Sequence, residues 1–366
     1  MKKNKYLHFA PDSVYTQDYI HKINKLYHEK EHCFFVYSYD FGKKRAYQDN
    51  NIFIIQNNSL KNLFKIIRFV FQSRTIILHS LFLDKVNFLM FAVLTRLSKK
   101  CYVWVIWGGD LTIDYEKEQQ IRGLSIQKRI KRFCRRTIIK NLDVVVSCES
   151  DYDYAYDAYK IKCPRLEAMY AYNFPDINSH CVNKEEGRLN VLIGHSASVI
   201  DKHIEAYHIL KRNDFEGAVF SVLSYDGDQS YIQEVCKEGE GLFGKKYHPI
   251  TEWMNREDYM KFLSSMDMAI FLGDKQTAAG NILMMLMFGI KIFANDYGIV
   301  PILKKMGAII METCEINKKS IVSGLSPDEI EVNKSIALKI VSDEYFKDHW
   351  DNVFLFKKKK DISRRI

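Results

Sequence analysis

The segment Met268-Ala-Ile-Phe-Leu-Gly-Asp-Lys-Gln-Thr-Ala-Ala-Gly-Asn-Ile-Leu-Met-Met-Leu-Met-Phe-Gly-Ile-Lys291 passes from strand to helix and back to strand. An apolar run enters a polar loop, a helix opens on Ala278-Ala-Gly-Asn281, and Gly289 ends that helix before the next apolar run. An anion at the helix start would meet backbone N–H groups, the positive end of the helix dipole and Lys275. The segment therefore predicts a βαβ unit with an anion site in its loop.

The same alternation of strand and helix patterns continues in both directions. In the second half we predict strands at 189–194, 219–223, 268–272 and 291–294, with helices between them and helices at 327–341 and 344–356. In the first half we predict strands at 6–10, 33–37, 52–55, 75–78, 101–106 and 143–147, with helices at 15–29, 60–71 and 85–97. This alternation predicts mostly parallel sheets with helices on both faces.

The length of the chain predicts two such domains, because 366 residues is about twice an average domain. We assign residues 1–172 to the first domain, 173–188 to a linker, 189–342 to the second domain, and 343–366 to a helix and basic tail that pack back on the first. Parallel sheets bind ligands at the carboxyl ends of their strands. We therefore expect two Rossmann-like domains that face each other across a cleft holding the active site.

Composition excludes several classes of protein. No run of residues approaches the ~20 apolar residues of a membrane-spanning helix. The basic N-terminus leads directly into a strand-like segment, so we expect a cytoplasmic and not a secreted protein. The eight cysteines form no C-x-x-C pair, which disfavours a structural zinc site and a disulfide framework.

Positive charge is concentrated in the first half of the chain. Residues 1–180 carry 29 Lys and Arg against 18 Asp and Glu, whereas residues 181–366 carry 25 against 27. The segment 122–140 holds eight cations and no acid, and apolar residues recur along it at near-helical spacing. Such a basic amphipathic helix can lie on an anionic membrane, with Lys128, Arg129, Arg132, Arg135 and Arg136 toward the lipid, or present a solvated face. Nucleic acid is not expected as a partner, because the aromatic residues do not interleave with the basic ones.

Two further segments place small and polar residues after a predicted strand. Gly194-His195-Ser196 follows the strand at 189–194 and precedes a helix, so it is suited either to an anion or to an ordinary turn. Trp107-Gly108-Gly109-Asp110 follows the strand at 101–106. Asp110 could take a proton from an acceptor hydroxyl there, or serve only the turn. His8, Asp12 and His79 follow other strands at the same predicted sheet edge and are further candidate bases.

Several of these blocks resemble glycosyltransferase family 56. The matching blocks span about residues 75 to 305 and include Ile106-Trp-Gly-Gly-Asp-Leu111, Val191-Leu-Ile-Gly-His-Ser196 with Lys202-His-Ile204, Tyr231-Ile-Gln-Glu-Val235, Tyr259 with Leu263 and Asp267, and Gln276 with Gly280, Leu283 and Gly289. The chain departs from the family pattern at His195, where asparagine is expected, and at Asn281, where threonine is expected.

The resemblance implies a GT-B fold and a TDP-linked 6-deoxyamino sugar donor of the Fuc4NAc type. It also implies that no metal ion is used and that the acceptor is an undecaprenyl-diphosphate-linked saccharide at the inner face of the bacterial inner membrane. Such a reaction belongs to the assembly of O-antigen or of polysaccharides like enterobacterial common antigen.

The candidate residues fall into three groups. For catalysis we expect Asp110, followed by His8 and Asp12. For the donor we expect Gly194, His195, Ser196, Tyr225, Lys246, Lys275, Gln276, Gly280 and Asn281, with the lysines and the helix start balancing the charge of the diphosphate in place of a metal. For the acceptor we expect His79, Trp107, Gly108 and Gly109. No cofactor is expected besides the nucleotide-sugar substrate.

Two alternatives remain open from the sequence. The chain could be a GT-B transferase that uses a UDP- or GDP-linked sugar. It could also be a protein that binds a nucleotide sugar without transferring it.

Overall fold

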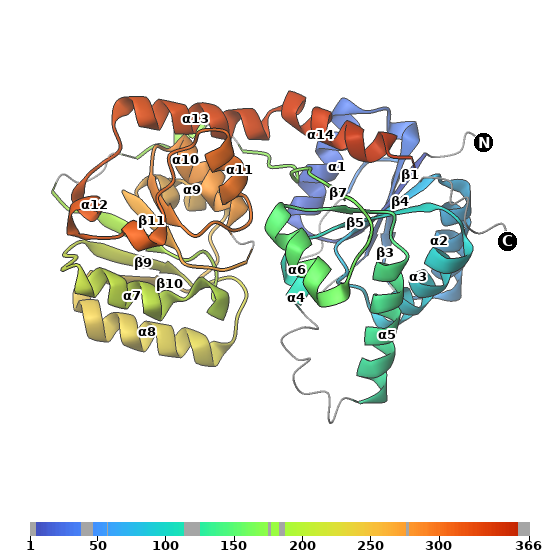
Figure 1. Ribbon diagram of the computed structural model, residues 1–366, viewed down its shortest axis with the longest axis horizontal. Helices are drawn as coiled ribbons and strands as arrows, with labels where there is room; N and C mark the ends of the chain where they lie inside the picture. Colours follow the sequence, from blue (N-terminus) through green and yellow to red (C-terminus); the bar gives the residue numbers. More distant parts are fainter. Residues whose placement is uncertain are drawn as a thin grey trace. The chain divides into compact units, whose positions relative to one another are not determined.

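The chain forms two compact units, each built on its own β-sheet (Figure 1). The computed structural model describes residues 5–37, 47–56, 58–112, 125–174, 177–182, 187–275 and 278–357. Unit 1 comprises residues 1–172 together with 342–366, and unit 2 comprises residues 173–341. In both sheets all of the paired strands are parallel, which confirms the prediction of a doubly wound α/β chain.

The sheet of unit 1 has seven strands in the order β3-β2-β1-β4-β5-β6-β7. Their bounds are β1 Tyr6–Pro11, β2 His32–Tyr37, β3 Ile52–Ile55, β4 Thr75–His79, β5 Cys101–Val105, β6 Val144–Val146 and β7 Arg165–Leu166. The central strands are continuous runs of buried residues, as expected for a sheet covered on both faces.

Helices cover both faces of this sheet. They are α1 Val14–Leu26, α2 Leu60–Gln72, α3 Lys85–Leu97, the short α4 Gly109–Thr112, α5 Ile126–Lys140, α6 Glu149–Tyr159 and α14 Asp343–Leu355. Helices α2, α3, α5 and α6 contribute to one apolar core, and α1 and α14 contribute to the core on the opposite face. Ser13, Ser59, Asp84 and Ser125 start α1, α2, α3 and α5 by accepting hydrogen bonds from N–H groups of the first turn.

The C-terminal helix α14 belongs to unit 1 although unit 2 precedes it in the chain. Trp350 is fully buried, packs with its ring tilted against that of Tyr19 on α1, and donates a hydrogen bond from Nε1 to the carbonyl oxygen of Met169 (2.9 Å). Lys22 and Lys25 of α1 pair with Asp343 at the start of α14, at 2.8 and 2.6 Å. Apolar burial and these ion pairs together hold α14 on α1.

The sheet of unit 2 has five strands in the order β10-β9-β8-β11-β12. Their bounds are β8 Asn190–Ile193, β9 Ala218–Val222, β10 Tyr247–Ile250, β11 Met268–Phe271 and β12 Lys291–Ala294. The helices are α7 His203–Arg212, α8 Gln229–Phe243, α9 Arg256–Ser264, α10 Ala279–Met287, α11 Val300–Lys305, α12 Lys318–Val322 and α13 Pro327–Val341.

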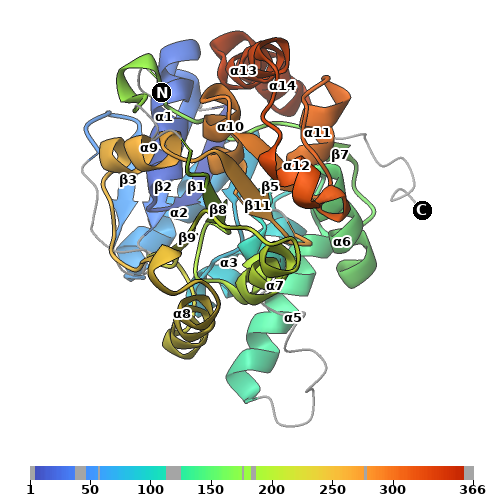
Figure 2. The same cartoon turned by 90° about the vertical axis from the view of Figure 1, so that its left-hand side faces the viewer.

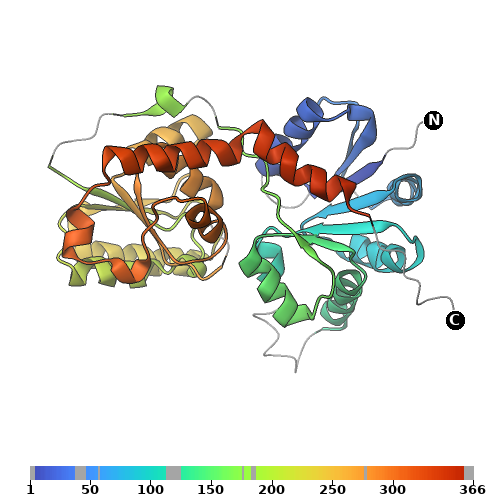
Figure 3. The same cartoon turned by 45° about the horizontal axis from the view of Figure 1, so that its top comes forward.

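Two layers of helices enclose the sheet of unit 2. Helices α7 and α8 lie on one face, whereas α9 and α10 lie on the other (Figures 1 and 2). Helix α13 packs along α10 (Figure 3), where Ile330 lies against Gly289 so closely that a Cβ on Gly289 would come within 2.8 Å of it. The methionine-rich α10 is almost entirely buried by these contacts.

Candidate functional site

The loop after β8 turns sharply at Gly194, which has a φ of 66°. A Cβ at this position would come within 2.5 Å of Nε2 of His203, and the backbone angle is one that side-chain-bearing residues rarely adopt. Glycine is therefore required by both the backbone and its neighbour. The N–H of Gly194 still bonds the carbonyl oxygen of Ile270 on β11, at 3.2 Å, which holds the turn at the sheet edge.

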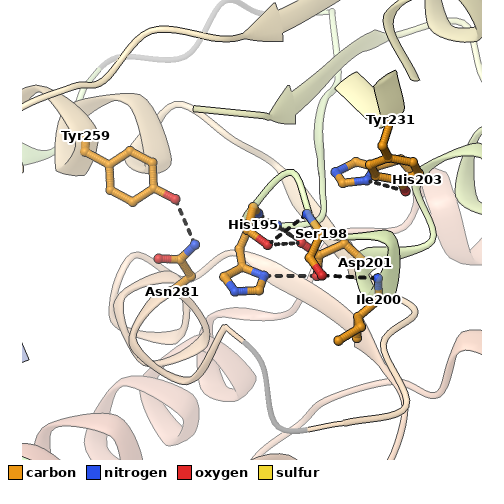
Figure 4. Close-up of polar contacts among 9 residues, drawn as sticks. His195, Ser198, Ile200, Asp201, His203, Tyr231, Tyr259 and Asn281 are labelled. Carbon is orange, nitrogen blue, oxygen red and sulfur yellow. Dashed lines mark hydrogen bonds and ion pairs between the residues drawn. The ribbon is translucent and has the colours of Figure 1, made fainter. Parts of the chain in front are cut away.

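Asp201 organises the residues that follow Gly194. Its Oδ2 atom accepts hydrogen bonds from the N–H of His195 (3.2 Å) and from the N–H and hydroxyl of Ser196 (2.9 and 2.8 Å). Its Oδ1 atom lies 3.0 Å from Nδ1 of His195 (Figure 4). Because Nδ1 is held by Asp201, the Nε2 atom of His195 lies on the ring edge away from the carboxylate.

The Asp201 carboxyl is buried yet stays ionised. Burial alone would raise its pKa, but attraction and hydrogen bonds from His195 outweigh burial and bring the pKa below its ordinary value. His203, next along the chain, is also buried, and burial lowers its pKa to about 4. His203 is thus neutral, and its Nδ1 lies 3.2 Å from the Tyr231 hydroxyl (Figure 4).

The loop after β11 lies beside the loop after β8, because β8 and β11 are neighbours with Ile193 paired to Ile270. An ion pair between Lys202 and Asp274, at 3.4 Å, joins the two loops. Asn295, which follows β12, donates from Nδ2 to the carbonyl oxygen of Leu272 at 2.9 Å. The carboxyl edge of unit 2 is therefore a cross-linked set of loops.

Helix α10 begins within this set of loops. Ala278 has a left-handed φ of 56°, and Ile282 is the first residue whose N–H bonds inside the helix, to the Ala278 carbonyl. The N–H groups of Ala279, Gly280 and Asn281 precede that bond and lie at the positive end of the helix. Nδ2 of Asn281 donates to the Tyr259 hydroxyl on α9 at 2.8 Å, which leaves the Asn281 Oδ1 atom facing elsewhere (Figure 4).

The structure brings most of the predicted donor residues to this one edge. Gly194, His195, Ser196, Lys275, Gly280 and Asn281 all follow β8 or β11 at their carboxyl ends. Tyr225 follows β9, and its carbonyl oxygen accepts from the N–H of Ala197 at 2.8 Å, which ties its loop to the loop after β8. Gln276 lies outside the described residues.

The prediction for Lys246 is wrong. Lys246 immediately precedes β10 and pairs with Glu216, which lies just before β9. Both residues are at the amino edge of a parallel sheet, at the opposite end from Gly194. Lys246 follows a helical pattern, and because β10 has no apolar run to mark it, the sequence alone places Lys246 at no sheet edge.

Four residues at this edge were not among the predicted site residues, namely Asp201, Tyr231, Tyr259 and Asn295. Asp201 could have been found, because an aspartate shortly after a Gly-x-Ser turn is well placed to accept from the N–H groups of that turn. Tyr231 and Tyr259 stand in the sequence blocks that resemble family 56, which is the signal for them, whereas only the fold brings Asn295 near the two loops.

Asp110 of unit 1 is buried and holds its own loop in place by hydrogen bonds. Oδ2 accepts from the N–H of Leu81 (2.7 Å) and from Nε1 of Trp104 (2.8 Å), and Oδ1 accepts from the N–H of Trp107 (2.9 Å). The side chain has no exposure, and burial raises its pKa despite the nearby Arg135. The prediction that Asp110 is the catalytic base is therefore corrected, because a substrate hydroxyl has no access to its oxygens.

His8 and His79 are likewise buried, in a chain of rings that crosses three strands. Nε2 of His8 lies 2.9 Å from Nδ1 of His32, and Nδ1 of His8 lies 3.0 Å from Nε2 of His79. Nδ1 of His79 lies 3.0 Å from the Tyr170 hydroxyl. Burial lowers the pKa of all three histidines, to about 3 for His32 and His79. The predictions of His8 as a base and His79 as an acceptor contact are corrected, since neither side chain is exposed.

The remaining candidates of unit 1 lie at the carboxyl edge of its sheet. Asp12 follows β1, is half-buried, and accepts a hydrogen bond from the Tyr47 hydroxyl at 2.8 Å. Trp107 follows β5, and its ring meets those of Tyr15 and Tyr170 edge to face. Gly108 has a φ of 80°, and Gly109 is exposed at the start of α4.

The cations of α5 divide between surface and core. Lys128, Arg129 and Arg136 are exposed and Arg132 is half-buried. Arg135 is buried, donates to the carbonyl oxygens of Leu81 (3.2 Å) and Asp110, and lies over the rings of Trp104 and Tyr159. The prediction that Arg135 faces a membrane is therefore wrong, because its guanidinium supports the Asp110 loop.

Two observations concern membranes and metals. Among the residues described, no helix has the length and apolar character needed to cross a membrane. Within the same ranges, no three or more His, Cys, Asp or Glu side chains are grouped so as to hold a metal ion.

The fold is that of GT-B glycosyltransferases. The chain is similar to HepE from Anabaena, crystallised with UDP and glucose, at a TM-score of 0.64 and 11% identity over 95% of this chain and 99% of that chain. It is similar to a glycosyltransferase from Rickettsia africae, at a TM-score of 0.63 and 12% identity over 97% and 98% of the two chains. It also resembles sucrose-phosphate synthase from Thermosynechococcus elongatus, at a TM-score of 0.58 and 10% identity over 96% of each chain.

Within that class, residues 15–322 match the model of the family described as 4-alpha-L-fucosyltransferase, glycosyl transferase group 56. The chain belongs to this family and is a glycosyltransferase. The resemblance found in the sequence is thereby confirmed.

Proposed function

We propose that this protein transfers a 6-deoxyamino sugar of the Fuc4NAc type from a TDP-linked donor to an undecaprenyl-diphosphate-linked saccharide. The observation that carries the proposal is the cross-linked carboxyl edge of unit 2, where the loop at 194–201 and the start of α10 lie together. Membership of a family described by fucosyl transfer supports a 6-deoxy sugar as the transferred group.

The donor diphosphate binds at the start of α10 in this proposal. The N–H groups of Ala279, Gly280 and Asn281 point toward the anion, and Lys275 adds a full positive charge in the same loop. Together they stabilise the charge that develops on the departing TDP, so the reaction proceeds without a metal ion. His195 and Ser196, held by Asp201, contact the nucleotide or the sugar from the neighbouring loop.

The transfer exchanges one bond for another. An acceptor hydroxyl oxygen forms a bond to the anomeric carbon while the bond from that carbon to the diphosphate oxygen breaks, and TDP leaves with the electron pair. The hydroxyl proton passes to a base. Asp12 fills this role in the proposal, because the other candidate bases, Asp110, His8 and His79, are fully buried. Trp107, Gly108 and Gly109 line the acceptor side of the same sheet edge.

The lipid-linked acceptor places the reaction at the cytoplasmic face of the bacterial inner membrane, in O-antigen or related polysaccharide assembly. Lys128, Arg129 and Arg136 on the exposed surface of α5 support attachment to anionic lipid. We propose a peripheral association.

A thermal-shift comparison of TDP, UDP and GDP tests the donor. The cognate nucleotide at about one hundred times its Kd should stabilise the protein by ~2.7 kcal/mol. Greater stabilisation by UDP would favour the alternative of a UDP-sugar donor, as bound by HepE. Ser196→Ala should weaken the response, whereas Ser230→Ala on α8 should leave it unchanged.

Transfer itself is measured with the TDP-sugar and a lipid-linked acceptor in EDTA. We expect turnover in EDTA and its loss in Asp12→Asn. A requirement for added Mg²⁺ or Mn²⁺ would contradict the metal-independent reaction. TDP binding without transfer or donor hydrolysis would indicate a non-catalytic binding protein.

A further inference from the structure

Three neighbouring helices of unit 1 carry exposed apolar residues in addition to those buried against the sheet. Ile66 and Val70 of α2, Phe88 and Phe91 of α3, and Ile138 of α5 are buried in the core against the sheet. The same helices also carry exposed apolar side chains, which are Leu60, Phe64 and Phe71 on α2, Val86, Leu89, Val93 and Leu97 on α3, and Ile126, Ile130 and Phe133 on α5.

The exposed apolar residues form a stripe on each helix. On α3 they recur at intervals of three or four residues, and on α5 they do so along its first two turns. On α2 and α3 this spacing places them on one side of the helix, opposite the residues buried against the sheet, whereas on α5 Ile126 and Ile130 continue the row of the buried Cys134 and Ile138 into the exposed first two turns. The exposure is large, at 70% for Phe64, 70% for Leu97 and 76% for Ile126. An apolar surface of this extent marks an interaction site.

All of the charged residues within these three helices are basic. Residues 60–72, 85–97 and 126–140 contain no Asp or Glu, and their Lys and Arg residues are Lys61, Lys65, Arg68, Lys85, Arg96, Lys128, Arg129, Lys131, Arg132, Arg135, Arg136 and Lys140. Apart from the buried Arg135, each of these cations is exposed or half-buried on the same three helices as the apolar stripes. The sequence indicated this character only for α5.

The layer is held together by contacts between α3 and α5. Nζ of Lys131 lies 5.3 Å from the centre of the Phe88 ring, and Lys85 donates to the side chain of Gln127. Helices α2, α3 and α5 contribute to the same core on the same face of the sheet. Their outer sides therefore form part of one helical layer.

We infer that the outer surface of α2, α3 and α5 docks on an anionic lipid bilayer, with its apolar side chains inserted and its lysines and arginines on the lipid phosphates. The charge argues for an anionic occupant, and the exposed Leu, Phe and Ile side chains argue for one with an apolar interior, which excludes nucleic acid. This inference deepens the proposed function and rests on it, because a lipid-linked acceptor requires the enzyme to work at a bilayer.

Vesicle co-sedimentation tests the inference with the full chain. Wild-type protein should bind phosphatidylglycerol-containing vesicles at least tenfold more tightly than phosphatidylcholine vesicles. Part of that binding should persist in 0.5 M NaCl, because inserted side chains are not screened by salt. Equal affinity for the two kinds of vesicle, or complete loss of binding in salt, would overturn insertion by a basic and apolar face.

A multiple variant tests whether vesicle binding depends on this surface or on exposed apolar residues in general. The quadruple variant Phe64→Ser, Leu89→Ser, Leu97→Ser and Ile126→Ser should lose at least tenfold in affinity for anionic vesicles and all of its salt-resistant binding. The matched control, Trp253→Ser with Val322→Ser, removes side chains of similar exposure from unit 2 and should bind like wild type. Unchanged binding of the quadruple variant, or equal loss in the control, would overturn the inference.

Folding and function are monitored separately. An unchanged melting temperature of the quadruple variant establishes that it is folded; if it is unfolded, the single variants Phe64→Ser and Ile126→Ser replace it, each with an expected loss of at least threefold. A concentration-dependent dimer of wild type that the variant lacks would assign the surface to a second copy and overturn the inference. Vesicle binding without transfer from any nucleotide sugar would overturn the proposed function and leave the docking surface in place.

Discussion

The buried carboxylate of Asp201 accepts hydrogen bonds from both the N–H and the hydroxyl of Ser196, at 2.9 and 2.8 Å. A single charged group thus fixes both the backbone and the side chain of Ser196, in the loop after β8. Because the N–H groups of His195 and Ser196 also donate to Asp201, the loop is held in one conformation before any ligand arrives, which lowers the cost of ordering on binding.

Asp201→Asn should loosen this loop. The amide keeps one acceptor but turns an N–H₂ group toward other donors, so we expect a loss of ~2 kcal/mol in unfolding free energy. We also expect at least a tenfold weaker affinity for the cognate nucleotide, measured by calorimetry. The control is the variant Asp214→Asn, in which the replaced residue is exposed and paired with Lys318, and this variant should bind nucleotide like wild type. Wild-type affinity in Asp201→Asn would show that the loop does not contact the donor.

Gly194→Ala should destabilise unit 2 by ~1–3 kcal/mol, because the new Cβ meets His203 and the backbone angle is strained. Gly241→Ala provides the matched control, since this glycine lies in α8 with open space around it. Alanine favours a helix more than glycine does, so the control should be neutral or more stable by up to ~1 kcal/mol. Chemical denaturation compares the two variants, and equal effects would contradict the steric explanation.

Asp110→Asn and Asp12→Asn should have opposite consequences. Asp110→Asn disturbs three hydrogen bonds to a buried group, so we expect ~3 kcal/mol lower stability with kcat of the folded enzyme within a few fold of wild type. Asp12→Asn should keep the melting temperature and lower kcat by at least a hundredfold. If Asp110→Asn instead loses activity at unchanged stability, its assignment as a loop organiser is wrong.

The buried histidines should make unit 1 sensitive to acid. Burial lowers the pKa of His32 to about 3, so between pH 6.5 and pH 3 the unfolded chain binds a proton that the folded chain does not. Stability is therefore fully present above pH 6.5 and falls as the pH is lowered, by about 1.4 kcal/mol per pH unit for each such histidine. In His32→Gln the slope of unfolding free energy against pH should be shallower by that amount. Asp151, whose pKa burial raises to about 7, acts in the opposite sense but is common to both proteins.

The layout of strands and helices was largely predictable from sequence, because buried parallel strands are continuous apolar runs and most helices have a clear amphipathic period. The two strands that were missed, β7 and β10, are short and partly exposed, and β10 contains a proline, so neither gives an apolar run. Helix α10, in contrast, was predicted from the sequence, because glycines and apolar residues mark its start and its end.

The site was less predictable, because a strand end places a residue at an edge without saying whether its side chain points outward. Asp110 lies at the expected edge, yet Trp104 and Leu81 donate to its oxygens from within the fold. Arg135 lies on a basic helix, yet its position on the inner side directs it to the core. Burial of a charged side chain depends on partners distant in sequence, and one chain alone does not reveal them.

The return of α14 to unit 1 means that the polypeptide passes between the units twice, near residues 172 and 342. A gene shortened at Val341 would thus remove a piece of the first unit while appearing to trim only the end of the second. The surface of Tyr19 and its neighbours that Trp350 covers would then meet water. Separate production of unit 1 therefore requires that residues 342–366 be joined directly to residue 172 or to the N-terminus.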